Sequence, residues 1–169
     1  MNGVLSSWIW PALTAALGFV YVALLVAQWW KRRKPHQLAW AFGFLLYAVA
    51  AVMEAYSEFS QRWDPTVYRF YIVIAASLVG FLGLGTLYLI TKNRWLGHAY
   101  LAFNAVALGI FLWGSLNANL LMDKLVPGIV VGGQALGESG TFPRIMSLWF
   151  NIPGSLLLLG GSAWSVIKF

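Results

Sequence analysis

The sequence decides its fold at the stretch Lys31-Arg32-Arg33-Lys34-Pro35-His36, the densest run of charge in the chain. Apolar runs lie on both sides of it, and each is long enough to cross the roughly 30 Å hydrocarbon core of a bilayer. The whole chain is 60% hydrophobic and only 9% charged, whereas soluble domains are roughly 25% charged. A water-soluble core cannot bury that much apolar surface, so the sequence predicts an all-α, polytopic membrane protein.

Five apolar segments are expected to cross the membrane as a helical bundle. Tryptophans bracket the first segment at both ends, as in the aromatic belts of membrane helices. The residues before it lack the basic region of a cleavable signal, so we expect this segment to be retained as a helix. With no internal repeat and no separate soluble domain visible, residues 1–169 are expected to form a single transmembrane domain. The predicted spans are 8–30, 38–56, 70–90, 98–116 and 147–166, with a long outer loop over 117–146.

Basic residues are unevenly divided between the two sides that alternating spans define. One side carries seven of the 11 Lys and Arg residues and none of the five acids. Because short cytoplasmic loops carry an excess of Lys and Arg, we expect the N-terminus outside and the C-terminus in the cytoplasm. Basic clusters also attract anionic lipid at roughly 1 kcal/mol per residue. The residues expected to set topology and contact headgroups are Lys31, Arg32, Arg33 and Lys34.

The long outer loop contains a short apolar stretch at 125–133. It forms either a lid lying on the bundle or a re-entrant segment. A re-entrant backbone must be shielded from lipid by protein or by a water-filled cavity. Since loops generally run over the surface, we favour the lid.

Glu54 is the only ionisable residue placed within a predicted span rather than at its edge. A charge inside a membrane is costly unless it is paired or protonated, which makes such a residue a functional candidate by default. The structural alternative is a partner such as Arg62, Arg69 or a tyrosine hydroxyl. At helical spacing Tyr47 and Glu58 share the face of Glu54, so they are candidates for the same ligand or proton site.

Polar and small side chains also recur along one face of the fifth span. In lipid such side chains usually face other helices, so we expect them to form hydrogen bonds between helices or, alternatively, to line a polar path. On the second interpretation Asn151 and Ser155 would share a cavity with Glu54. The stripe consists of Ser147, Asn151, Ser155, Leu158, Ser162 and Ser165.

Two further features predict helix packing. Ala76 and Gly80 form a small-xxx-small pair, which permits close approach of a neighbouring helix. Asn104 lies inside the fourth span, where we expect it to hydrogen-bond to an adjacent helix.

Several kinds of chemistry are not supported by the sequence. With no cysteine there is no thiolate nucleophile and no iron–sulfur cluster. His36 and His98 stand at similar depth, as a b-type haem between helices requires, but histidines beside basic interface residues are more often solvated. The string Gly137-Glu138-Ser139-Gly140 matches the GxSG of rhomboid proteases, yet it lies in a loop without a histidine to act as base. We therefore expect no enzymatic activity, no metal and no cofactor. Because the charges punctuate apolar runs rather than form a basic soluble face, no nucleic-acid partner is expected either.

Short stretches near the end of the chain resemble a known group of proteins. The segments Phe150-Asn151-Ile152-Pro153-Gly154 and Leu159-Gly160-Gly161-Ser162-Ala163-Trp164-Ser165 resemble the last helix of small uncharacterised multi-pass bacterial membrane proteins. The segment Leu82-Gly83-Leu84-Gly85-Thr86-Leu87-Tyr88 resembles their third helix. The resemblance implies a location in the bacterial cytoplasmic (inner) membrane and carries no activity, substrate or cofactor with it.

Three functions follow from these features. The first is a non-enzymatic protein that acts by association, as an accessory or assembly subunit of a membrane complex or as a homo-oligomer. The second is a small transporter, channel or ligand sensor that uses Glu54 and the polar face of the fifth helix. The third is a haem-binding electron carrier using His36 and His98.

Overall fold

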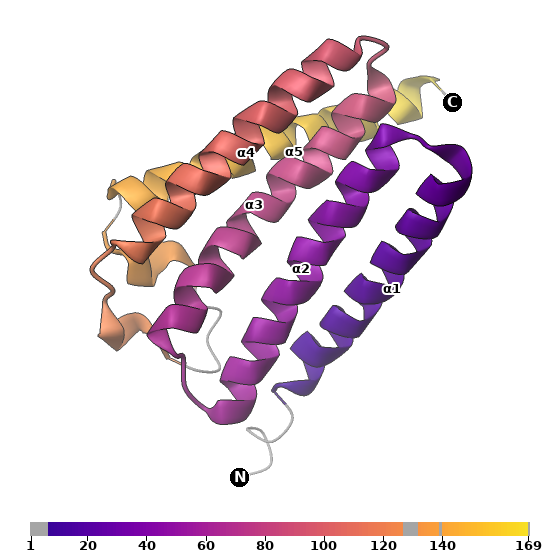
Figure 1. Cartoon of the computed structure of the whole chain (residues 1–169). Coiled ribbons are helices and arrows are strands. Elements are labelled where there is room, and N and C mark those ends of the chain that lie inside the picture. The colour runs from indigo at the N-terminus through magenta and orange to yellow at the C-terminus, as the bar shows by residue number, and fades with distance from the viewer. Residues whose placement is uncertain (1–6, 127–131, 139, 169) are drawn as a thin grey trace.

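The computed structural model describes residues 7–126, 132–138 and 140–168, which fold into a bundle of long α-helices (Figure 1). Five of the helices in this part of the chain are long and apolar enough to cross a membrane. The predicted all-helical fold with five potential membrane spans is therefore confirmed for the described residues. The long helices are α1 Ile9–Arg32, α2 Pro35–Ser60, α3 Pro65–Ile90, α4 Arg94–Leu116 and α5 Phe142–Lys168, with short 3₁₀ helices η1 Met122–Lys124 and η2 Gly133–Leu136 between α4 and α5.

All five long helices extend beyond the predicted spans at one end or both, and side-chain caps fix the starts of α3 and α4. The side chain of Asp64 accepts hydrogen bonds from the backbone N–H groups of Thr66 and Val67, at 2.8 and 3.1 Å, and so caps α3. Asn93 caps α4 in the same way. Glu58, which the predicted spans left in a connection, therefore lies on α2, and the loop predicted over 117–146 ends at residue 141.

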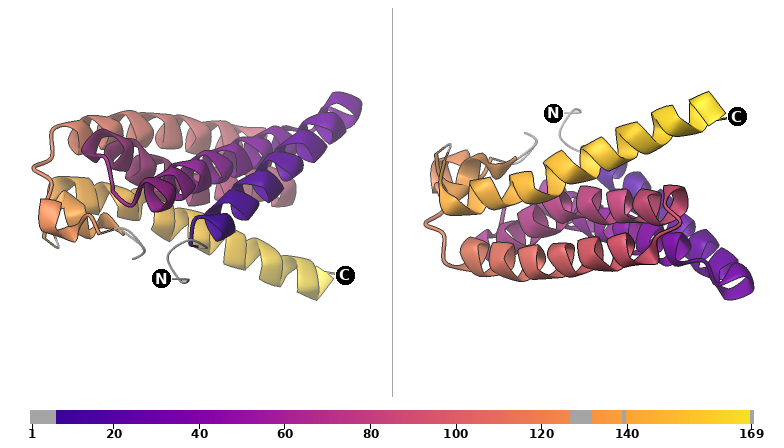
Figure 2. Two further views of the ribbon diagram at one scale, coloured as in Figure 1. Left: turned by 90° about the horizontal axis from the view of Figure 1, so that it is seen from below. Right: turned by 90° about the horizontal axis from the view of Figure 1, so that it is seen from above.

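The central element of the bundle is α3, which packs against α2, α4 and α5. By contrast, α1 packs against α2 and makes only slight contact with the other described helices. Figure 1 shows α1 to α4 side by side, with α5 behind them. Towards its C-terminus α5 diverges from α4 (Figure 2).

The two ends of the bundle differ in charge, and we name them by it. The basic end contains residues 31–34 and 91–94, whereas the acidic end contains residues 54–64, 117–126, 132–138 and 140–141. At the basic end the Arg33 guanidinium lies over the rings of Trp29 and Trp30, 4.5 and 4.8 Å from their centroids. These are cation–π contacts, made here by one of the residues predicted to set topology.

At the acidic end the described parts of the long loop pack onto α3. The Tyr68 hydroxyl donates a hydrogen bond to the Gly132 carbonyl at 2.8 Å, and Leu125 and Leu136 are buried in the same apolar cluster. The choice between a lid and a re-entrant segment over 125–133 depends on residues 127–131, which lie outside the described residues.

Glycines bring α3 and α5 into backbone contact. A Cβ added to Gly154 would lie 2.5 Å from the carbonyl oxygen of Val79, and one added to Gly83 would lie 2.8 Å from the Gly154 Cα. Both distances are far inside the roughly 3.5–4.0 Å at which carbon atoms attract one another. Glycine is therefore required on both sides of the crossing.

Several polar side chains bond within their own helix rather than between helices. Asn104 donates to the Tyr100 carbonyl at 2.8 Å, Ser147 to the Arg144 carbonyl at 2.7 Å, and Ser162 to a carbonyl one turn earlier at 2.9 Å. The interhelical bonds expected for these three residues were therefore wrong. Side-chain hydroxyls and amides on a helix can reach the carbonyl three or four residues back, so they do not need a neighbouring helix.

Arg69 joins α3 to the end of α4. Its guanidinium donates to the carbonyls of Ser115 and Ala118, the latter at 2.8 Å, while the Ser115 hydroxyl donates back to the Arg69 carbonyl at 3.1 Å. The last carbonyls of a helix have no partner within it and carry the negative end of its dipole. Arg69 therefore caps α4 and is not the partner of Glu54 that the sequence suggested.

Candidate functional site

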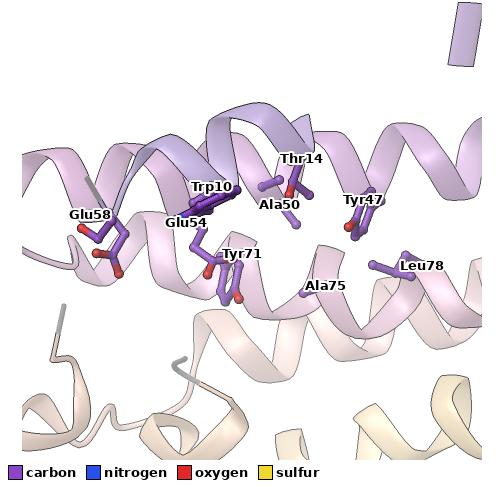
Figure 3. Close-up of a pocket in the computed structure, with 12 residues that line it drawn as sticks. Trp10, Thr14, Tyr47, Ala50, Glu54, Glu58, Tyr71, Ala75 and Leu78 are labelled. Atoms are coloured by element: carbon purple, nitrogen blue, oxygen red, sulfur yellow. The ribbon is translucent and has the colours of Figure 1, made fainter. Parts of the chain in front are cut away.

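A cavity of about 530 Å³ opens between α1, α2 and α3 at the acidic end (Figure 3). The structure brings three of the predicted site residues together here, because Tyr47, Glu54 and Glu58 lie on one face of α2. The lining residues are Ser7, Trp10, Pro11 and Thr14 from the start of the chain, Tyr47, Ala50, Ala51, Glu54 and Glu58 from α2, and Tyr71, Ala75 and Leu78 from α3.

Glu54 is the partly buried carboxylate of this cavity. It makes no hydrogen bond or ion pair with any residue that the structure describes. Glu58 lies one helical turn further along α2 and is only 7% exposed. Among the described lining residues there is no Lys or Arg, so an ionised Glu54 has no basic partner in this part of the lining.

Tyr71 is a site residue that the sequence did not reveal. Its side chain is 7% exposed and lies beside Glu54 in the cavity (Figure 3). The Trp63 ring packs against it with centroids 4.8 Å apart, yet within the described chain its hydroxyl has no hydrogen-bond partner. Tyr71 is on a different helix from Glu54, so no spacing along the sequence relates the two residues.

A second cavity of about 330 Å³ continues the first towards the middle of the helices. Thr14, Tyr47 and Leu78 line both cavities, so the two form one elongated groove. The second cavity is mostly apolar, and its other lining residues are Leu17, Gly18, Tyr21, Phe44 and Leu82. The groove is thus acidic at one end and apolar at the other.

Asn151 does not line the cavity that holds Glu54. It lines an adjoining cavity of about 270 Å³ between α3, the first half of α5 and the described parts of the loop, and Tyr71 and Ala75 line both cavities. Ser155 lines neither of these two cavities. The central helix α3 lies between α2, which carries Glu54, and α5, which carries Asn151.

The two histidines are engaged by aromatic neighbours. The His36 ring meets Trp40 edge-on at 5.3 Å, and the His98 Nδ1 lies within hydrogen-bonding distance of the Tyr88 hydroxyl, at 3.0 Å. An apolar cavity of about 510 Å³ lies between α2, α3 and α4, but neither histidine lines it. The haem interpretation therefore gains no support from this geometry. No group of three potential metal ligands is found in the described part of the chain, and Ser139 of the GxSG string lies outside it.

The chemistry available in the groove is recognition of a cation. Carboxylates attract a positive group directly, and the faces of Trp and Tyr rings attract ammonium ions through their quadrupoles. Trp10 and Tyr71 supply such rings beside Glu54, and Tyr47 supplies another towards the far end of the cavity (Figure 3).

No protein family model, no curated protein and no solved structure matches this sequence. The function must therefore be argued from the residues of the groove.

Proposed function

We propose that the protein is a membrane-embedded binding protein, a ligand sensor or carrier, that takes a cationic group at Glu54. The observation that carries this proposal is the Glu54 carboxylate on a cavity of about 530 Å³ whose described lining contains two acids and no base.

The cost of placing a charge at this depth supports the proposal. A carboxylate inside a helical bundle is expensive unless a partner compensates it. Arg69, one of the alternative partners considered from the sequence, donates hydrogen bonds to carbonyls at the end of α4 instead. A ligand cation would compensate Glu54 and would also contact the aromatic rings around it.

Replacing Glu54 with glutamine is expected to weaken the binding of tetramethylammonium about tenfold or more. Tetramethylammonium has no N–H to donate, so its attraction to the carboxylate is coulombic, about 4 kcal/mol for unit charges about 4 Å apart at an effective dielectric constant of about 20. About 1.4 kcal/mol corresponds to a factor of ten. The measurement is tetramethylammonium affinity by calorimetry, with the protein in nanodiscs of neutral lipid.

The matched control is Glu138→Gln, which removes the same charge from an exposed loop position at the same end of the bundle. It is expected to leave the affinity unchanged. Equal affinities of the two variants, or no binding by the unmodified protein, would remove Glu54 from the function.

We also propose that the basic end faces the cytoplasm of a bacterial cell and the acidic end faces outward. Lys31 to Lys34 are all exposed, as residues that contact headgroups must be. Because the chain contains no cysteine, single cysteines report on each end without a background signal. In intact cells an impermeant maleimide should label Asn119→Cys at the acidic end, and it should label Lys92→Cys at the basic end only after permeabilisation. The reverse pattern would invert the topology.

The second candidate function is association, as an accessory subunit or a homo-oligomer. It is favoured by the exposure of Gly160, Ser162 and Ser165 on the last half of α5, because small and polar side chains in membrane helices usually face protein. Native mass measurement in mild detergent tests it. A mass of one chain, unchanged by Ser162→Leu, would count against association through this face.

A further inference from the structure

We infer that the ligand is a single-chain amphiphilic amine, with its ammonium group at Glu54 and its alkyl chain in the apolar half of the groove. This inference rests on the proposed function for its contact at Glu54. The apolar half of the groove is an independent observation, because a small cation bound at Glu54 would leave this half empty.

The shape of the groove matches an amphiphile aligned with one leaflet of the bilayer. Figure 3 shows Glu54 and Glu58 together at one end of the cavity, with Tyr47 and Leu78 at the other. From Leu78 the second cavity continues to Phe44. Glu54 lies ten residues after Phe44 on α2, a separation of about 15 Å along the helix. This is about half of the hydrocarbon thickness. A chain bound this way points towards the bilayer centre, as lipid chains do.

The arrangement of the helices gives such a ligand a route from the bilayer. The groove is bounded by α1 and α3, yet α1 is held mainly by α2 and makes only slight contact with α3. Its contact with α2 is close at Gly18, where an added Cβ would lie 2.9 Å from the Ala48 Cβ. The groove can therefore be reached sideways from the lipid, between α1 and α3, by a molecule already dissolved there.

The charges select an amine over the other amphiphiles of a membrane. A phospholipid or a fatty acid would bring an anionic group beside Glu54 and Glu58, and among the described lining residues there is no Lys or Arg to pair with it. Like charges in direct contact repel strongly in a medium of low dielectric constant. An alcohol would fit the apolar half but would leave the carboxylate uncompensated.

The test is photo-crosslinking of dodecylammonium that carries a diazirine at the end of its chain. The full-length protein is placed in phosphatidylcholine nanodiscs, and the adducts are located by mass spectrometry. We expect adducts on the apolar half of the groove, at Leu17, Phe44 and Leu82. Excess dodecylammonium should reduce them at least tenfold, whereas dodecanol and butylammonium at the same concentration should not.

A blocking variant separates the groove from simple enrichment of the probe in lipid. Leu17 lines the second cavity but not the one that holds Glu54, so Leu17→Trp should reduce the adducts at Phe44 and Leu82 about tenfold while tetramethylammonium still binds. The matched control is Leu24→Trp, at a residue of α1 that is 53% exposed. It should change neither the adducts nor the binding of tetramethylammonium. Circular dichroism and elution volume of both variants verify that they are folded.

The outcomes distinguish the inference from the proposed function. If the adducts scatter over exposed faces and are insensitive to Leu17→Trp, or if butylammonium competes as well as dodecylammonium, the amphiphile is wrong and the cation site stands. If dodecanol competes equally and Glu54→Gln changes nothing, the cation site is wrong and only an apolar groove is left. Adducts in the groove that are lost in both Glu54→Gln and Leu17→Trp support both.

Discussion

Replacing Gly154 with alanine is expected to destabilise the folded bundle by roughly 1–3 kcal/mol, the usual cost of an added methyl group in a tightly packed interior. The new Cβ would meet the backbone of α3, 2.5 Å from the Val79 carbonyl oxygen and 2.9 Å from the Gly80 nitrogen. Backbone atoms inside a helix cannot move aside as the end of a long side chain can. The two helices must therefore separate, and the loss is measured as a lower midpoint of SDS-induced unfolding.

Gly160→Ala is the matched control on the same helix. An added Cβ there has no other atom within 4 Å. Because alanine is favoured over glycine in a helix by roughly 0.5–1 kcal/mol, this variant should be as stable as the unmodified protein or slightly more so. Equal unfolding midpoints for Gly154→Ala and Gly160→Ala would show that the crossing of α3 and α5 is looser than described.

Replacing Arg69 with methionine is expected to cost about 3 kcal/mol. Each hydrogen bond from a charged donor contributes about 1.5–3 kcal/mol, and Arg69 donates to two carbonyls at the end of α4, those of Ser115 and Ala118. Methionine keeps much of the length of the side chain but leaves both carbonyls without this donor. Thermal unfolding in detergent measures the loss, and hydrogen exchange should rise in the last turn of α4.

Two variants calibrate that result. Arg62→Met removes the same charge from an exposed residue at the same end of the bundle, and its effect should be within about 0.5 kcal/mol of zero. Arg69→Lys should be intermediate, because a lysine has no planar fork to reach two carbonyls at once. If Arg69→Met and Arg62→Met behaved alike, the cap on α4 would contribute nothing to stability.

The helices could be predicted because a membrane-spanning helix requires a long, nearly uninterrupted run of apolar residues. An apolar segment of about 20 residues is the length a helix needs to cross the bilayer, so the five spans followed from composition and length alone. Their ends were less accurate, since helix ends depend on caps such as Asp64 rather than on hydrophobicity. These extra turns carry Glu58 and Arg69.

Part of the candidate site was also visible in the sequence. Tyr47, Glu54 and Glu58 belong to one helix, so helical periodicity placed them on one face. Tyr71 and Trp10 come from other helices, and no single-helix pattern relates them to Glu54. The assignment of Arg69 as a partner of Glu54 failed because the sequence does not show the end of α4, where unpaired carbonyls compete for the guanidinium.

The hydrogen-bond partners of the polar residues on α5 could not be predicted from the sequence. A stripe of serines marks a helix face, but it does not say whether the hydroxyls bond outward or to their own backbone. Ser147 and Ser162 bond to their own backbone, and Asn151 lines a cavity that adjoins the one at Glu54.

The position of α3 has a consequence for how the chain assembles during synthesis. Its partners α2, α4 and α5 include both earlier and later helices, and the backbone at Gly83 lies against Gly154 of α5, which leaves the ribosome after α1 to α4. Until α5 enters the membrane, the backbone at Gly83 lacks this contact. Nascent chains arrested before residue 142 should therefore contain a protease-sensitive bundle, which becomes resistant once α5 is released.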